Sequence, residues 1–164
     1  MASSDLMIDV QAGEELMIRN AVAVWRGGPG AGEGSVTTSS GVLTNALYAF
    51  GSSTGSEPCT NPSEMLAAAI ASCMSLMVTQ EMARAGLHEE SVKTETELTL
   101  VETKGHWEIT NIHLTVSSDV AEADVEKFEH AARVAKGKCP ISHALKIPIK
   151  MTTKVQPVPH PAAA

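Results

Sequence analysis

Two cysteines in unlike settings are the residues of this chain whose type and position point most directly to chemistry. Cys73 lies in an apolar run with the start signals and composition of a core helix. Cys139 is flanked by Lys138 and by Pro140, which can open a helix, so positive charge and a helix N-terminus both favour its thiolate. Because the thiolate is the reactive form of cysteine, the pair indicates redox chemistry.

The residues alone leave structural roles open for both cysteines. A cysteine in an apolar helix often behaves as a small buried hydrophobe, and burial makes it inert unless a cation stabilises the thiolate. Cys139 also fits a cap-like residue at a turn without any redox role. A metal site made of Cys73, Cys139 and His143 is a further interpretation, although no second paired ligand motif accompanies it.

The composition is typical of one globular domain. The 164 residues suffice for a core without disulfide or metal staples, and the odd number of cysteines, three, does not fit a secreted disulfide framework. A net charge of -7 and the lack of a basic patch argue against a nucleic-acid partner. The sequence has neither a run of about 18 apolar residues nor a secretory signal, so we expect a soluble cytoplasmic protein without a membrane partner.

A single domain is expected over residues 16–155, between an N-terminal extension at 1–15 and a flexible C-terminal tail at 156–164. Its first part contains short extended segments around a glycine-rich turn at 27–34, followed by a Gly- and Ser-rich loop at 51–60. The extended segments are expected at 16–18, 21–25, 35–39 and 42–50.

The sequence marks the two ends of a first long helix. Asn61 fits an N-cap and Pro62 the first helical position, with Glu64 placed as the capping-box residue. The helix is expected to run to about Ala85, where Gly86 stops it.

A second, amphipathic helix is expected over residues 124–136, and Gly137 follows as its terminator. Apolar residues at helical spacing define the face that should meet the core. They are Val125, Phe128, Ala132 and Ala135.

Two strands at 92–101 and 107–116 are predicted to pair antiparallel around the turn Lys104-Gly105, and a last strand is expected at 147–155. The order of strands and helices indicates an α+β fold with a mostly antiparallel sheet. The residues expected to face the core from the first two strands are Leu98, Leu100, Ile112, Leu114 and Val116.

Each of the two cysteines belongs to a longer motif. The motifs are Thr60-Asn61-Pro62-x-Glu64-x-Leu66-x-Ala68-Ala69-x-Ala71-x-Cys73-x-Ser75 and Lys138-Cys139-Pro140-x-Ser142-x-x-Leu145-Lys146. In this order they resemble the motifs of the OsmC/Ohr family of thiol-dependent hydroperoxide reductases. The segment 39–43 also resembles the OsmC branch, and the resemblance extends from about Ala21 to Lys154.

This resemblance implies an OsmC-like fold, in which two long central helices belong to an intertwined homodimer with active sites at the subunit interface. It also implies that Cys73 is the peroxidatic cysteine, which reduces an organic hydroperoxide to an alcohol and becomes a sulfenic acid. Cys139 is then the resolving cysteine, which forms an intramolecular disulfide with Cys73. An external dithiol, often a lipoyl group, reduces that disulfide, and neither a metal nor another cofactor is required.

The chain departs from the family at the positions that activate the thiolate. Many members pair a Glu directly after the Asn-Pro with an Arg from the glycine-rich loop, whereas Ser63 and Ala31 stand at these positions here. Arg26 is the nearest arginine and is the candidate for thiolate activation. Glu64 is a weaker candidate, because its capping-box position already explains it.

Two functions therefore remain open. The first is the peroxidase just described. The alternative is a non-catalytic OsmC-like protein that senses redox conditions or binds an apolar ligand, because the usual Arg/Glu pair is absent. Cys59 belongs to neither motif and is interpreted as an accidental surface thiol or as an alternative resolving cysteine.

Overall fold

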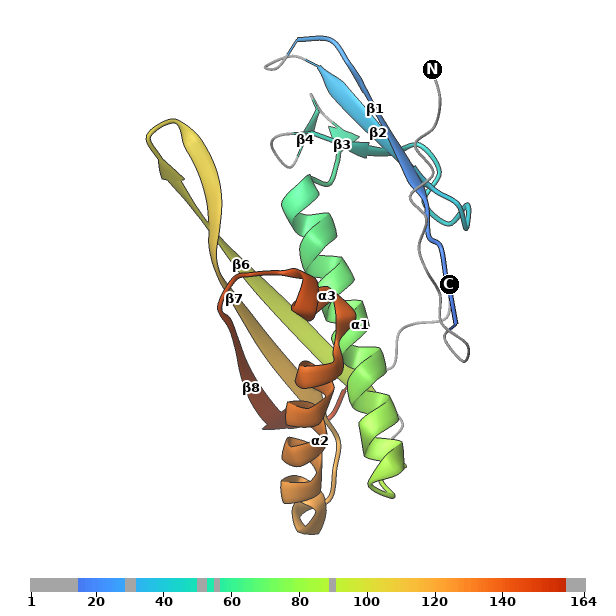
Figure 1. Cartoon of the computed structure of the whole chain (residues 1–164), viewed down its shortest axis with the longest axis vertical. Helices are drawn as coiled ribbons and strands as arrows, with labels where there is room; N and C mark the ends of the chain where they lie inside the picture. The colour runs from blue at the N-terminus through green and yellow to red at the C-terminus, as the bar shows by residue number, and fades with distance from the viewer. Residues whose placement is uncertain (1–14, 29–31, 50–52, 55–56, 89–90, 159–164) are drawn as a thin grey trace. The chain divides into compact units, whose positions relative to one another are not determined.

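The computed structural model of the chain describes residues 15–28, 32–49, 53–54, 57–88 and 91–158 (Figure 1). Its internal contacts divide the chain into two compact units. Unit 1 is Met1–Asn61 and unit 2 is Pro62–Ala164. Residues 1–14 of the expected extension at 1–15 and residues 159–164 of the expected tail lie outside the described residues.

Unit 1 contains a three-stranded antiparallel sheet in the order β1-β2-β3. The glycine-rich segment joins β1 to β2, as predicted. Arg26 at the end of β1 pairs with Glu33 at the start of β2. Gly34 is required in β2, because an added Cβ would lie 2.3 Å from the Tyr48 ring. The strands are β1 Ala21–Arg26, β2 Glu33–Thr38 and β3 Ala46–Tyr48.

Three predictions for unit 1 need correction. Residues 16–18 are not a strand, because β2 ends at Thr38, opposite Ala21, and leaves them without a pairing partner. Of the described part of the expected segment 42–50, residues 42–49, only β3 is a strand, since the chain turns between β2 and β3. The expected loop at 51–60 contains a small antiparallel pair, β4 Ser53–Thr54 and β5 Glu57–Pro58.

The long helix of unit 2, α1, spans Pro62–Arg84, close to its predicted ends. Gly86 follows in the left-handed region at φ 77°, which a glycine adopts without strain. Helix α1 is long and apolar enough to cross a membrane by its length and mean hydropathy. The core helix of a soluble protein also meets these two criteria. One face of α1 lies in the core and consists of Ile70, Met74, Val78 and Met82.

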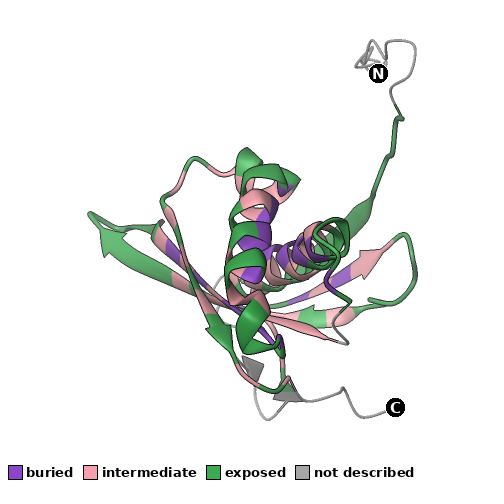
Figure 2. Ribbon diagram, turned by 90° about the horizontal axis from the view of Figure 1, so that it is seen from below, coloured by how far each residue is buried: buried purple, intermediate pink, exposed green. Residues whose placement is uncertain are grey.

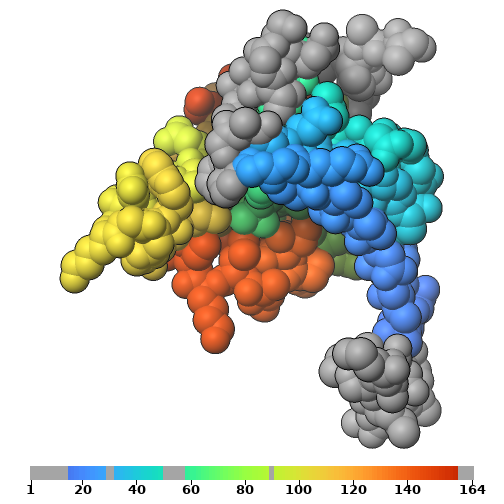
Figure 3. All heavy atoms as spheres, turned by 90° about the horizontal axis from the view of Figure 1, so that it is seen from above, coloured from blue at the N-terminus to red at the C-terminus, as the bar shows by residue number. Residues whose placement is uncertain are grey.

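The predicted hairpin forms from β6 Val92–Thr103 and β7 His106–Ser118. Lys104 and Gly105 both have positive φ, as a two-residue hairpin turn requires. The turn projects away from the helices and is yellow in Figures 1 and 3. Of the residues expected in the core from these strands, Ile112, Leu114 and Val116 are buried and Leu98 packs against the core.

Leu100 is the exception, with 37% of its surface exposed. The register of β6 against β7 shifts between Thr99 and Leu100 through a bulge. A bulge interrupts the alternation of side chains, so the period-two pattern fails to predict which face Leu100 takes.

The last strand, β8 Ile149–Val155, completes the sheet β6-β7-β8. It lies parallel to β7, whereas the strand pairs β1-β2, β2-β3, β4-β5 and β6-β7 are antiparallel. Beyond β8, Gln156 continues the contact, because its backbone N–H donates to the Ser118 carbonyl at 3.1 Å.

The second long helix, α2, spans Val125–Lys138 and follows a short 3-10 turn, η1 Glu122–Asp124. Its predicted apolar face packs as expected, with Phe128, Ala132 and Ala135 buried. Helix α1 packs against α2 and β6, and Figure 2 shows the buried segments concentrated on the helices and the middle of the strands. These contacts place the core between the two helices and the sheet.

Gly137 does not end α2, contrary to the prediction. The helix continues through Lys138, and Cys139 leaves it with extended backbone angles, φ -66° and ψ 113°. Pro140 explains this ending, because a proline disfavours the helical conformation for the residue before it. Pro140 then opens a short helix, α3 Pro140–Ala144, as the sequence predicts.

Candidate functional site

The structure brings the two motif cysteines together. The Sγ atoms of Cys73 and Cys139 lie 2.9 Å apart although the residues are 66 positions apart in sequence. No disulfide joins them. A disulfide has an S–S distance of about 2.0 Å, so a small closing movement can convert this contact into a bond.

Each thiol is held by an element whose local sequence explains its position. Cys73 lies on α1, partly buried and packed against the core formed by that helix. Cys139 is fully buried at the junction of α2 and α3, where Pro140 removes it from the helical path. The side chain of Cys139 caps α3 and accepts a hydrogen bond from the Ser142 backbone N–H at 3.5 Å. The cap-like role expected for Cys139 is thus compatible with its contact with Cys73.

The surroundings shift the pKa values of the two thiols in opposite directions. Burial, together with a hydrogen bond to Cys139, raises the pKa of Cys73 to about 11. For Cys139, burial opposes ionisation, but the hydrogen bonds with the Cys73 thiol and with Ser142 outweigh it and lower the pKa. Cys139 is therefore the more acidic thiol, in agreement with the expectation from its neighbouring residues.

His143, expected near Cys139, turns its ring elsewhere. Its Nε2 atom lies 2.5 Å from the Gly137 carbonyl oxygen, at the end of α2. Among the residues that the structure describes, no group of three or more His, Cys, Asp and Glu side chains is arranged to hold a metal ion. The geometry thus uses His143 as a polar contact at the end of α2.

The other candidate residues are Arg26, Cys59 and Glu64. Arg26 is the exposed last residue of β1 in unit 1, and Cys59 lies half-buried after β5 in the same unit. Glu64 lies in the first turn of α1, and Ala31 lies outside the described residues. Roles for Arg26 and Glu64 in activating Cys73 stay predictions.

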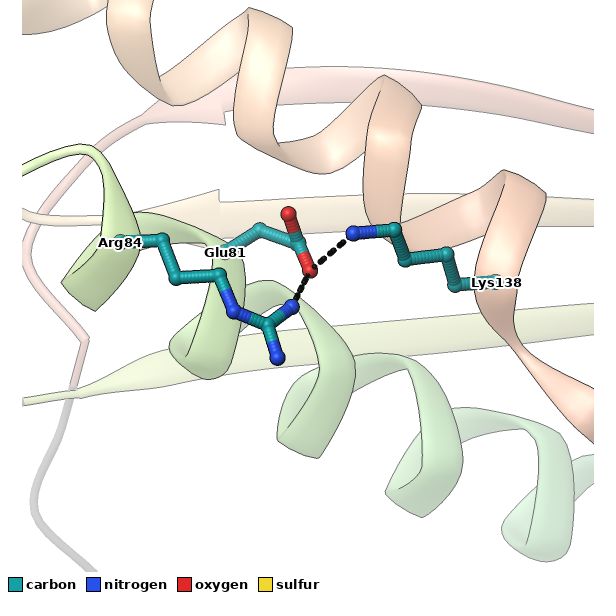
Figure 4. A network of polar contacts seen from close by, with 3 residues as sticks. All are labelled: Glu81, Arg84 and Lys138. Atoms are coloured by element: carbon teal, nitrogen blue, oxygen red, sulfur yellow. Dashed lines mark hydrogen bonds and ion pairs between the residues drawn. The ribbon is translucent and has the colours of Figure 1, made fainter. Parts of the chain in front are cut away.

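One charged cluster next to the site is not apparent from the sequence. Glu81 on α1 accepts hydrogen bonds from Lys138, at 2.9 Å, and from Arg84 (Figure 4). Only 10% of the Glu81 side chain is exposed. The i, i+3 spacing predicts the contact with Arg84. The contact with Lys138 joins residues 57 positions apart, and no local pattern indicates it.

Comparisons with known proteins find relatives of this chain by sequence. A family model described as OsmC-like protein matches residues 54–154. Peroxiredoxin OsmC of Escherichia coli is 33% identical over 129 residues, which cover 79% of this chain and 90% of that protein.

Solved structures show the same fold. The organic hydroperoxide resistance protein OhrB of Bacillus subtilis matches with a TM-score of 0.63 and 21% identity, over 84% of this chain and 98% of that chain. A second organic hydroperoxide resistance protein, from Elizabethkingia anophelis, matches with a TM-score of 0.69 and 18% identity, over 87% of this chain and 99% of that chain.

Proposed function

Because this chain belongs to the OsmC-like family, we propose that it is a thiol-dependent peroxidase that reduces organic hydroperoxides to alcohols. The names of its relatives, peroxiredoxin and organic hydroperoxide resistance protein, support a peroxide-related redox role. The observation that carries the proposal is the 2.9 Å contact between Cys73 Sγ and Cys139 Sγ. At this distance, a sulfenic acid formed on one cysteine can condense with the thiol of the other to a disulfide without a large rearrangement.

In the proposed cycle Cys73 is the peroxidatic cysteine. Its thiolate attacks the distal oxygen of the hydroperoxide, and the O–O bond breaks. The leaving alkoxide takes up a proton and departs as the alcohol, while Cys73 is oxidised to a sulfenic acid. The core residues around α1 make the surroundings of Cys73 apolar, which favours an alkyl hydroperoxide over hydrogen peroxide.

Cys139 acts as the resolving cysteine in the second step. Its thiolate attacks Cys73 Sγ, the S–S bond forms, and hydroxide leaves from the sulfenic acid and is protonated to water. The lowered pKa of Cys139 suits this step, because only the thiolate attacks. An external dithiol, such as a lipoyl group of a partner protein, then reduces the disulfide and restores both thiols. This cycle requires no metal or other cofactor.

The raised pKa of Cys73 means that the first step needs an activating group. Burial, the Cys139 thiol and the Ile141 backbone set this pKa among the described residues, and none of them is a cation. We propose Arg26 for this role, with Glu64 as a weaker candidate for its partner. An arginine close to Cys73 would favour the thiolate by charge.

The test of Arg26 compares two exposed arginines of unit 1. If Arg26 activates Cys73, Arg26→Ala is expected to slow oxidation by hydroperoxide about tenfold or more. Arg19→Ala serves as the control, since both arginines are exposed but Arg19 precedes β1, whereas Arg26 ends β1 next to the glycine-rich turn. Equal oxidation rates in the two variants would exclude Arg26.

The raised Cys73 pKa also favours the second function, a redox sensor or apolar-ligand-binding protein that reacts slowly with oxidants. Rapid mixing distinguishes the two functions. The reduced protein is mixed with equimolar tert-butyl hydroperoxide or hydrogen peroxide, and the thiols are trapped and identified by mass spectrometry. A fast Cys73–Cys139 disulfide with the organic peroxide, absent in Cys73→Ser, supports the peroxidase. Two thiols that remain reduced for minutes support the sensor or binding protein.

A further inference from the structure

The Glu81–Lys138 contact links the same two segments that carry the thiols. Glu81 lies on α1 eight residues after Cys73, and Lys138 directly precedes Cys139. The Lys138 ammonium donates to Glu81 Oε1 at 2.9 Å, and Figure 4 shows it reaching across from the end of α2. The carboxylate and the ammonium therefore bridge α1 and α2 at the point where the chain turns toward the resolving cysteine.

The backbone at this point of the chain is irregular. Cys139 is extended between two helices, so no continuous helix fixes its position relative to α1. Glu81 is almost covered by protein, with 10% of its side chain exposed, whereas 52% of Lys138 is exposed. A carboxylate with restricted access to water gains more from a charged partner than a fully solvated one.

We propose that Glu81 and Lys138 are a positioning pair that keeps Cys139 within reach of Cys73 and so accelerates disulfide formation from the sulfenic acid. This inference rests on the proposed peroxidase function. Among the described residues, the polar contacts of Glu81 and Lys138 are with each other and with Arg84, and none is to a cysteine sulfur. The pair therefore acts on the second chemical step and leaves the attack of Cys73 on the hydroperoxide unchanged.

Arg84 provides the matched control. It shares the same Glu81 oxygen, but it lies on α1 and so makes a contact within one helix. Arg84→Met removes one of the two cations at Glu81 without cutting the link between α1 and α2. Glu81→Met and Lys138→Met cut that link from opposite ends, with side chains that still favour a helix.

The experiment measures two rates in each variant after rapid mixing of the reduced protein with tert-butyl hydroperoxide. The first is the loss of the Cys73 thiol, and the second is the appearance of the Cys73–Cys139 disulfide. We expect Glu81→Met and Lys138→Met to slow the second rate about fivefold, the effect of an ion pair at the upper end of the usual range. The double variant should be no slower than either single variant, because both remove one interaction.

Four companion results are expected. The first rate should stay at the wild-type value in these variants, which also shows that they are folded. Excess peroxide should convert more Cys73 to sulfinic acid, because the sulfenic acid persists longer. Arg84→Met should resemble wild type, and Lys138→Arg should restore most of the second rate because it retains the charge.

The outcomes separate this inference from the proposed function. If wild type forms the disulfide rapidly and Glu81→Met does so equally fast, the positioning role is wrong and the peroxidase stands. If only Lys138→Met is slow, Lys138 acts through its charge on the Cys139 thiolate, and the positioning role is again wrong. If wild type forms no disulfide, the proposed function itself fails and the inference with it.

Discussion

At Cys73, burial and the neighbouring thiol act in the same direction and raise the pKa to about 11. At Cys139 the same contact acts in the opposite direction, because hydrogen bonds with Cys73 and Ser142 lower the pKa. When the pair loses one proton, these shifts favour the Cys139 thiolate and leave the remaining proton on Cys73. Any peroxidase activity depends on moving that proton away from the cysteine that we propose to attack the peroxide.

Replacing Cys139 by alanine should lower the pKa of Cys73. The substitution removes the hydrogen bond that helps to hold the Cys73 proton, while burial keeps the pKa above its ordinary value. The pH dependence of Cys73 alkylation by iodoacetamide, followed on the peptide by mass spectrometry, gives this pKa. Cys59→Ala is the control and should leave the midpoint unchanged. A midpoint that stays at the wild-type value in Cys139→Ala would contradict the assigned cause.

Glu81 makes a second prediction at the residue scale. The hydrogen bond from Lys138 lowers the pKa of Glu81 below its ordinary value of 4.5, with the charge of Arg84 as a further cause. A carboxylate with a depressed folded-state pKa stabilises the fold above its unfolded-state pKa, and this stabilisation is lost as the pH falls through the folded-state value. Stability should therefore fall below about pH 4.5 more steeply in wild type than in Glu81→Gln, which cannot ionise.

Urea unfolding midpoints of the two proteins at pH 6 and at successively lower pH values measure this difference. The midpoint of wild type is expected to exceed that of the variant at pH 6 and to approach it in acid. Parallel curves over the whole range would show that Glu81 gains nothing from its two cations.

At the scale of elements, the break between α2 and α3 determines where Cys139 lies. Pro140 disfavours the helical conformation for Cys139, which therefore leaves the axis of α2 and caps α3. We expect Pro140→Ala to allow α2 to continue through Cys139 and to move its thiol away from Cys73. Disulfide formation should slow by about tenfold or more, because reacting atoms must meet in a narrow geometry.

The control for this substitution is Pro148→Ala. The Pro148 carbonyl accepts a hydrogen bond from Ile112, and alanine retains that carbonyl. Circular dichroism should show more helix in Pro140→Ala and no change in Pro148→Ala. If the disulfide forms at the wild-type rate in Pro140→Ala, the helix break is not what places Cys139.

Local signals predict the elements of unit 2 well. Pro62 and Gly86 give the two ends of α1, and Lys104-Gly105 gives the turn between β6 and β7. Prediction from the sequence fails where two signals compete. Glycine commonly ends a helix, so Gly137 is expected to end α2, but Pro140 determines where α2 ends. It also fails for contacts between distant segments, such as β8 against β7, whose parallel register depends on packing.

The candidate site divides in the same way. The resemblance of the two motifs predicts that Cys73 and Cys139 pair, and the structure brings the thiols together. The Glu81–Lys138 contact has no such signal, because neither residue is unusual where it stands in the sequence. The contact depends on the packing of α1 against α2, which no local sequence pattern indicates.

At the scale of the whole molecule, apolar side chains remain exposed on both units. Unit 1 exposes Val22 and Val24 on β1, and unit 2 exposes Leu76 on α1. Leu76 lies on a helix whose opposite face, with Met74 and Val78, is fully buried. Such side chains leave water if the chain associates with another copy. Together with the family resemblance, this exposure supports the proposal that the chain forms an intertwined homodimer.

This proposal predicts a mass twice that of the single chain by light scattering after size-exclusion chromatography. Leu76→Glu should shift the protein toward the monomer, because a carboxylate buried without a partner in an interface is strongly unfavourable. Leu76→Met conserves the apolar volume and should remain dimeric. Since 58% of Leu76 is exposed in the single chain, neither substitution should prevent each chain from folding. A wild-type protein that is monomeric at micromolar concentration would show instead that these apolar side chains serve another purpose.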